Sequence, residues 1–187
     1  MIGKKKLDLF GVGLSLLLML VGLSSFALAK VATAAPKADW TTYTLEKEFT
    51  ISTPASWRKL NNSYLKLQVS SGREALLNIG TMPMPEGVST LDELVKSIKD
   101  SLKNMPGLQG EIINAKFQGK GWVGEEFKYS RATQDPEDKN VVIFCSDYLI
   151  VVGKSYYMVE IGSLKEKEAE YTTIFQDMIK SFQLLKK

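Results

Sequence analysis

The chain has 187 residues, of which 44% are hydrophobic and 24% are charged, and it contains one cysteine and no histidine. A single cysteine excludes an internal disulfide, so the folded part must be held together by its hydrophobic core. The lack of histidine excludes the catalytic arrangements in which an imidazole activates a serine or cysteine nucleophile.

The first 29 residues have the pattern of an export signal. Lysines at positions 4–6 precede an apolar run from Leu9 to Leu23, and Ala27-Leu28-Ala29 matches a cleavage motif. The alternative is an uncleaved anchor, because residues 9–29 are nearly long enough to span a bilayer. Both alternatives predict an exported protein that is secreted, periplasmic or on the cell surface, and the second adds membrane association through residues 9–29.

Most of the excess positive charge belongs to this segment. The full chain has 24 Lys and Arg residues against 21 Asp and Glu residues, and cleavage after Ala29 removes three lysines and Asp8, leaving 21 against 20. The mature chain is therefore nearly neutral, which argues against nucleic acid as a partner.

Residues 30–39 are mainly Ala, Thr, Lys and Pro without apolar periodicity, which predicts a flexible tether. The folded domain is expected over residues 40–187. It begins with a strand, since Phe49 and Ile51 in "EFTIST" alternate with polar residues.

The next residues, "TPASW", predict one short helical turn. Thr53 has the side chain of a helix N-cap and Pro54 suits the first helical position. Trp57 is then expected to fold back onto the sheet as a core residue.

Two strands, "YLKLQVS" and "ALLNIGT", predict a hairpin that turns at Ser71-Gly72. A helix follows, because Thr90 and Glu93 form a capping box and Pro106-Gly107 ends the helical pattern. Its apolar stripe consists of Leu91, Leu94, Val95, Ile98 and Leu102.

The second half predicts consecutive antiparallel strands, "EIINAKF", "GWVGEEFKYSR", "NVVIFCSDYLIVV" and "SYYMVEIG". Ser163 and Glu166 predict a second capping box, which opens a terminal helix. The apolar residues at helical spacing there are Ile174, Phe175, Met178, Ile179, Phe182 and Leu185. Antiparallel strands with two helices that cover the sheet indicate an α+β domain.

Taken together, these elements resemble the PsbP-like fold, which is named after an extrinsic subunit of photosystem II. The resemblance rests on "FTISTPASW", the amphipathic helix, "GKSYYMVEIGS" and "IFQDMIKSFQLL", and it covers about Thr42 to Leu185. It implies an antiparallel sheet of about six strands sandwiched between helices, an α/β/α arrangement. It also implies a protein that docks onto partners, as does the Mog nuclear-import factor, which shares the fold and binds the Ran GTPase.

Metal ions are associated with some PsbP proteins, often with histidine among the ligands. Because this chain has no histidine, no residue here can be assigned such a role, and no metal or cofactor is predicted. The acidic residues Asp135, Glu137 and Asp138 lack the spacing of a calcium loop and predict a solvated turn.

No catalytic residue is predicted either. Cys145 lies in the middle of a strand, where a buried structural cysteine is expected. The "VVGKS" segment has only the end of a phosphate-loop motif and predicts a hairpin turn. Glu125 and Glu126 are adjacent in a strand and point to opposite faces, so they make a poor acid-base pair.

The candidate partner surface consists of Met82, Met84 and Trp122. The two methionines, in "MPMPEG", either pack under their loop or form an adaptable contact surface, whereas two thioethers alone make a weak copper site. Trp122 is expected to be a core residue, with the alternative that it forms the floor of a shallow ligand site.

The sequence therefore predicts a non-enzymatic exported domain that binds a protein or an envelope component outside the cytoplasmic membrane. One alternative is an extrinsic subunit of the photosystem II type. Another is a small-ligand carrier or hydrolase that uses a cleft between the "MPMP" loop and Trp122.

Overall fold

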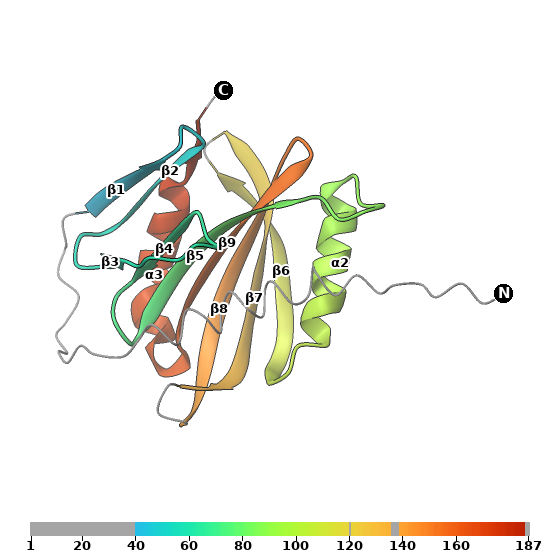
Figure 1. Cartoon of the computed structure of the whole chain (residues 1–187). Helices are drawn as coiled ribbons and strands as arrows, with labels where there is room; N and C mark the ends of the chain where they lie inside the picture. The colour runs from blue at the N-terminus through green and yellow to red at the C-terminus, as the bar shows by residue number, and fades with distance from the viewer. Residues whose placement is uncertain (1–39, 120, 136–138, 186–187) are drawn as a thin grey trace.

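The computed structural model of the protein describes residues 40–119, 121–135 and 139–185 (Figure 1). Its strands are β1 (Trp40–Leu45), β2 (Phe49–Pro54), β3 (Arg58–Lys59), β4 (Leu67–Ser70), β5 (Ala75–Pro83), β6 (Leu108–Gly119), β7 (Trp122–Gln134), β8 (Asn140–Val152), β9 (Ser155–Leu164) and β10 (Gln183–Leu184). Its helices are α2 (Leu91–Lys103), the 3-10 helix η1 (Lys165–Lys167) and α3 (Glu168–Ser181).

The strands form two antiparallel sheets. Seven strands make the main sheet in the order β3-β4-β5-β9-β8-β7-β6, and β1, β2 and β10 make a smaller one. The expected antiparallel α+β class is confirmed. The main sheet has seven strands where about six were expected, and β3, with two residues, is too short to show the apolar alternation that predicts a strand. The small second sheet was not expected, because the largely exposed β1 lacks that alternation as well.

The expected hairpins are confirmed. The β4–β5 pair turns after Ser70, and β6, β7, β8 and β9 follow one another as antiparallel neighbours. The "VVGKS" segment is the β8–β9 turn, where Gly153 has a φ of 62°. That left-handed backbone conformation favours glycine. The turn therefore accounts for Gly153 without a role in binding phosphate.

The main sheet buries residues on both faces. Along β9, Tyr157 and Val159 belong to a cluster that includes α3, whereas Tyr156 and Met158 belong to a cluster that includes α2. Because successive strand residues point to opposite faces, the two clusters lie on opposite sides of the sheet. Figure 1 shows α3 near the β4–β5 end of the sheet and α2 beside β6.

The capping box of α2 is confirmed. The Thr90 hydroxyl accepts a hydrogen bond from the backbone N–H of Glu93, and the Glu93 carboxylate accepts one from the N–H of Thr90. These two bonds satisfy backbone donors that a helix start leaves free.

The expected N-cap at Thr53 is wrong. Thr53 and Pro54 complete strand β2, where Thr53 is fully buried, and the chain turns without a helix. The N–H of Trp57 donates to the carbonyl of Pro54 at 2.9 Å, which closes the turn. Trp57 then packs in the α3 cluster, 5% exposed and edge-on to Tyr171, as expected of a core residue.

The expected capping box of the terminal helix is also wrong. Ser163 lies within β9, 2% exposed and paired with Ala75 and Phe144, so it cannot cap a helix. The chain instead enters α3 through η1, and the N-cap Lys167 makes no side-chain capping bond. Sheet pairing on both sides of Ser163 outweighs its local preference for a helix start.

Within the described residues, no helix is both long and apolar enough to cross a membrane. The predicted export signal at 1–29, the tether at 30–39 and the acidic residues Glu137 and Asp138 lie outside the described residues.

Candidate functional site: a polar cleft at one edge of the main sheet

The structure separates the three residues of the candidate partner surface. Met82 is 7% exposed in the α2 cluster, where its sulfur accepts a hydrogen bond from the Tyr156 hydroxyl at 3.3 Å. Met84 is half-buried against the same cluster. Trp122 is 6% exposed in the α3 cluster, on the other face of the sheet. These residues therefore do not form one surface or one cleft.

Trp122 has a structural position. Its indole N–H donates to the carbonyl oxygen of Phe182 at 3.0 Å, and its ring stacks on Phe117 and meets Phe182 edge-on. The close approach of Gly119 and Gly124 makes room for the ring, since a Cβ on Gly119 would lie 2.0 Å from it. Trp122 thus joins the β6–β7 hairpin to the chain segment that follows α3.

Cys145 is fully buried, as expected of a structural residue, and burial raises the pKa of its thiol. A thiol held in its protonated form is a poor nucleophile. No cluster of three His, Cys, Asp or Glu side chains that could hold a metal ion is found among the described residues.

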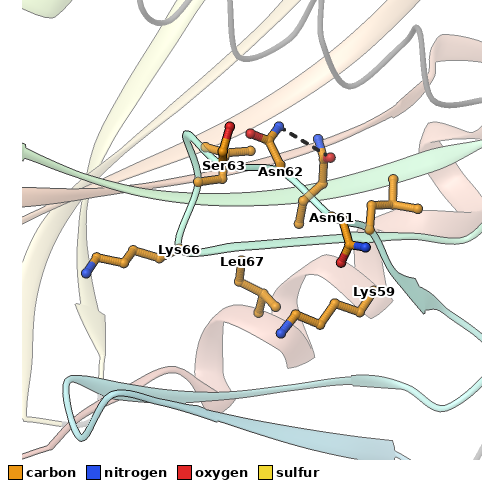
Figure 2. Close-up of a pocket in the computed structure, with 9 residues that line it drawn as sticks. Lys59, Asn61, Asn62, Ser63, Lys66 and Leu67 are labelled. Carbon is orange, nitrogen blue, oxygen red and sulfur yellow. Dashed lines mark hydrogen bonds between the residues drawn. The ribbon is translucent and has the colours of Figure 1, made fainter.

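A polar cleft of about 540 Å³ lies where β3 meets β4, and we call it the β3–β4 cleft. It is lined by Lys59, Leu60, Asn61, Asn62, Ser63, Leu65, Lys66, Leu67 and Gln68. Figure 2 shows Asn62 and Ser63 close together, with Asn61 near Lys59 and Leu67 between Lys59 and Lys66. The volume lies in the range of small-molecule sites in proteins.

The cleft exists because the chain leaves the sheet between β3 and β4. Pairing of Lys59 with Val69 and a hydrogen bond from the N–H of Leu60 to the carbonyl of Gln68 end the β3 side of the ladder. The N–H of Lys66 donates to the carbonyl of Ile79, and this bond begins the pairing of the chain with β5. Residues 61–65 form a loop between these two anchors, and its polar side chains surround the opening.

The loop is shaped by Asn62. Its side-chain oxygen accepts a hydrogen bond from the N–H of Tyr64 at 2.9 Å, a turn that Asn forms readily. Its amide nitrogen lies 3.5 Å from the side-chain oxygen of Gln68, shown as the dashed line in Figure 2. The side chain of Tyr64 is 73% exposed at the tip of this loop.

The two lysines that line the cleft differ in whether carboxylates lie close enough to compensate their charge. The ammonium of Lys66 lies 3.1 Å from Glu46 and 3.3 Å from Glu48, and the hydrogen bond to Glu46 is the main reason why the pKa of Lys66 is raised. Lys59 has no ion-pair partner among the described residues. The positive charge that remains uncompensated at the cleft is that of Lys59.

The β1–β2 turn that supplies Glu46 is strained. Glu46 and Lys47 have φ values of 45° and 59°, although neither is glycine. Left-handed backbone costs energy for such residues, and it is often retained where it positions a side chain for function. Here the turn holds Glu46 and Glu48 against Lys66 at the cleft.

A row of buried polar residues runs from the cleft across the α2 face of the main sheet. Gln68, Asn78, Glu160 and Asp147 are successive cross-strand partners, and each is at most 5% exposed. Gln68 donates to Asn78 at 2.9 Å, and Asn78 donates to Glu160 at 3.3 Å. The row connects the interior of the sheet to the floor of the cleft.

The far end of the row contains two carboxyl groups and one guanidinium. Asp147 accepts a hydrogen bond from the Tyr129 hydroxyl at 2.7 Å, and Arg131, 3% exposed, supplies the compensating charge. Burial raises the pKa of both Asp147 and Glu160. Two buried acids beside a single arginine therefore favour a state in which one of them keeps its proton.

Glu125 and Glu126 point to opposite faces, as expected. Glu126 accepts hydrogen bonds from the hydroxyls of Ser146 and Tyr148 and pairs with Lys128, whereas one oxygen of Glu125 is buried without a hydrogen-bond partner among the described residues. The two carboxylates do not share a site.

Sequence reasoning did not find the β3–β4 cleft. Its residues follow no motif, and the Lys66 contacts come from residues 18 and 20 positions away. The one available signal was "NNSY", a polar run that ends in an aromatic residue between two strands, which is typical of an exposed loop.

A seven-stranded antiparallel sheet with the helices α2 and α3 defines a class of α+β domain. Within that class, the chain has the fold of PsbP and Mog1. Cyanobacterial PsbP from Synechocystis superposes with a TM-score of 0.57 at 13% identity, covering 84% of this chain and 98% of that protein.

Two other solved structures share the fold. LpqN of Mycobacterium tuberculosis, involved in cell envelope biogenesis, gives a TM-score of 0.54 at 12% identity and covers 79% of this chain and 91% of its own. The Ran-binding protein Mog1p of Saccharomyces cerevisiae gives 0.52 at 10% identity and covers 79% and 96%. No protein-family model and no curated protein sequence matches the chain.

Proposed function

We propose that the protein is an exported, non-enzymatic binding domain that holds a component of the cell envelope at the β3–β4 cleft. The sheet is sandwiched between its two helices and acts as the rigid support of that cleft. The observation that carries the proposal is the lining of the cleft, in which side chains able to bind a ligand surround an opening of about 540 Å³.

The fold and the sequence support this proposal. Proteins of the same fold include one that binds Ran and one involved in cell envelope biogenesis. Residues 1–29 have the pattern of an export signal, which would bring the domain to the envelope. The photosystem II alternative rests on the fold alone, at 13% identity to cyanobacterial PsbP.

The predicted carrier or hydrolase with a cleft between the "MPMP" loop and Trp122 has no support in the geometry. Met82 and Trp122 are buried in different clusters on opposite faces of the sheet. The side chains of the β3–β4 cleft are amides, hydroxyls, lysines and leucines, which can bind a ligand but include no carboxylate.

Site-specific photocrosslinking in the exporting cells tests the proposal. A photoreactive residue replaces Asn61 at the cleft, and a matched one replaces the exposed Lys103 at the end of α2. We expect a discrete envelope adduct, identified by mass, from position 61 and not from position 103. Equal adducts from both positions, or none from position 61, would reject the cleft as the binding site.

Cell fractionation tests export separately. We expect the protein outside the cytoplasm, with an intact mass that reports whether residues 1–29 have been removed. Recovery only from the cytoplasm would overturn the exported location. The crosslinking result would then still decide whether the cleft is a binding site.

A further inference from the structure

We infer that the β3–β4 cleft binds an acidic saccharide, a sugar ring that carries a carboxylate or a phosphate. This inference rests on the proposed function, in which the cleft is the binding site, and it adds the chemical class of the ligand. Three properties of the cleft support it: its free hydrogen-bonding groups, its apolar floor and its uncompensated positive charge.

The free polar groups match the hydroxyls of a sugar. Asn61 and Ser63 line the cleft and make no side-chain hydrogen bond to other described residues. The Asn62 amide is held only by a long 3.5 Å contact to Gln68, at the outer limit of a hydrogen bond. Primary amides both donate and accept, as does a serine hydroxyl, so adjacent groups of this kind can pair with neighbouring sugar hydroxyls.

The apolar part of the cleft matches the carbon framework of the ring. Leu65 and Leu67 are 9% and 1% exposed, and Leu60 completes the leucine lining. A sugar has a face of C–H groups beside its hydroxyls, and a mixed lining of leucines and amides can contact both. A purely ionic ligand would leave these leucines without a function in binding.

Tyr64 supplies an independent observation on the same loop. A tyrosine side chain that is 73% exposed leaves a large apolar ring in water, although most large hydrophobic side chains in the described part of the chain are buried. Tyr64 itself does not line the cleft, but it lies between Ser63 and Leu65, which do. An aromatic ring attracts partially positive C–H groups to its face, so an exposed tyrosine on this loop is suited to contact a sugar that extends from the cleft. The Asn62 turn fixes the backbone on which this ring is carried.

The charge of the cleft selects an acidic sugar over a neutral one. Lys66 is compensated by Glu46 and Glu48, whereas Lys59 is exposed and has no ion-pair partner among the described residues. No carboxylate lines the cleft itself. A carboxylate or phosphate on the ligand can therefore pair with Lys59 without meeting a like charge in the lining.

Titration calorimetry of the purified full protein with defined oligosaccharides tests the inference. The probes are a short galacturonic acid oligomer, a sugar phosphate and a neutral glucose oligomer of the same length. We expect saturable binding of at least one acidic probe, with affinity about tenfold or more above the neutral oligomer, equal to about 1.4 kcal/mol. The carboxylate and phosphate arms identify which acidic group the cleft prefers.

Two variants and one matched control locate the binding. Lys59→Gln removes the uncompensated charge, and Tyr64→Ala removes the exposed ring; each is expected to weaken the acidic probe about fivefold or more. Arg58→Gln is the control, because Arg58 is the other exposed residue of β3 and belongs neither to the lining of the cleft nor to the 61–65 loop. Far-ultraviolet circular dichroism and melting confirm that each variant is folded before its affinity is compared.

The inference is overturned if the neutral oligomer binds as well as the acidic probes, or if Arg58→Gln weakens binding as much as Lys59→Gln does. Failure of every sugar to bind also overturns it. In that case an adduct formed at position 61 and not at position 103 would still support the proposed binding function. If no sugar binds and no adduct forms at position 61, the cleft is rejected as a binding site.

Discussion

Asp147 and Glu160 face one another on β8 and β9, and the physics of this pair is independent of any partner. They are direct cross-strand neighbours inside the domain, and the groups around them are Arg131, Tyr129 and Asn78. Only one of these neighbours carries a positive charge. The buried pair therefore makes the stability of the whole domain depend on pH.

We expect Asp147→Asn to remove much of that dependence. Burial raises the pKa of Asp147 to about 7 from its ordinary 3.8, so the folded state binds a proton that the unfolded state has released between these values. The stabilisation due to this proton is fully present below pH 3.8 and is lost as the pH rises to about 7. The free energy of unfolding of the wild type should therefore fall over this interval.

Urea denaturation at pH 5 and pH 8 checks this expectation, with Asp177→Asn on the exposed side of α3 as the control. The control should keep the pH dependence of the wild type. Equal dependence in Asp147→Asn and wild type would show that another group is responsible.

At the scale of elements, local signals predicted the start of helix α2 correctly, whereas they predicted helix α3 but misplaced its start. The Thr90 and Glu93 capping box lies in a segment that no strand pairs with, so the local pattern determines the structure. Ser163 belongs to the same pattern in sequence, yet pairing with β5 and β8 keeps it in a strand. Thr53 was misassigned for the same reason, because β1 pairs with it.

Replacing the confirmed cap tests its contribution. We expect Thr90→Ala to lower the free energy of unfolding by about 1 kcal/mol, because the N–H of Glu93 loses its acceptor. Thr172→Ala, in the interior of α3, removes a hydroxyl that bonds the backbone of its own helix and serves as the comparison. Denaturant titration of both variants gives the difference, and an equal loss in each would contradict a specific role for the cap.

The β6–β7 hairpin offers a second element-scale test. A methyl group on Gly119 would lie 2.0 Å from the ring of Trp122, so Gly119→Ala must displace the indole and weaken its hydrogen bond to Phe182. We expect a loss of about 1–3 kcal/mol, typical of overpacking.

Gly80→Ala is the control for this change, because its added methyl would lie 3.7 Å from Leu65, an ordinary contact distance. Thermal unfolding and the fluorescence maximum of tryptophan compare the two. A Gly119→Ala variant as stable as Gly80→Ala would mean that the hairpin adjusts without moving Trp122.

At the scale of the whole molecule, the class of fold was predictable and the cleft was not. Strand and helix periodicity are local, and they sufficed for the antiparallel sheet and both helices. The cleft depends on the β1–β2 turn reaching Lys66 and on where the ladder between β3 and β4 ends. Met82 and Trp122 were grouped as one surface because their sequence context does not reveal which face of the sheet each one occupies.

Loss of the last residues should affect the domain far more than their number implies. Phe182 is fully buried, and β10 pairs Gln183 with Thr50 and Leu184 with Phe49. We expect a chain that ends at Ser181 to melt at a temperature many degrees lower, since a large core side chain and its pairing are removed together. A chain that ends after Leu185 is the control, and equal melting of the two would show that the C-terminal strand contributes little.

Strand β2 lies between one neighbour that precedes it and another that is among the last residues described, since the small sheet has the order β1-β2-β10. A growing chain therefore cannot complete this sheet until its C-terminal residues have left the ribosome. Until then Phe49 lacks the stacking of Phe182, and the core around Trp122 stays open. The domain is thus kept from its final compact state until Phe182 and strand β10 have been synthesised.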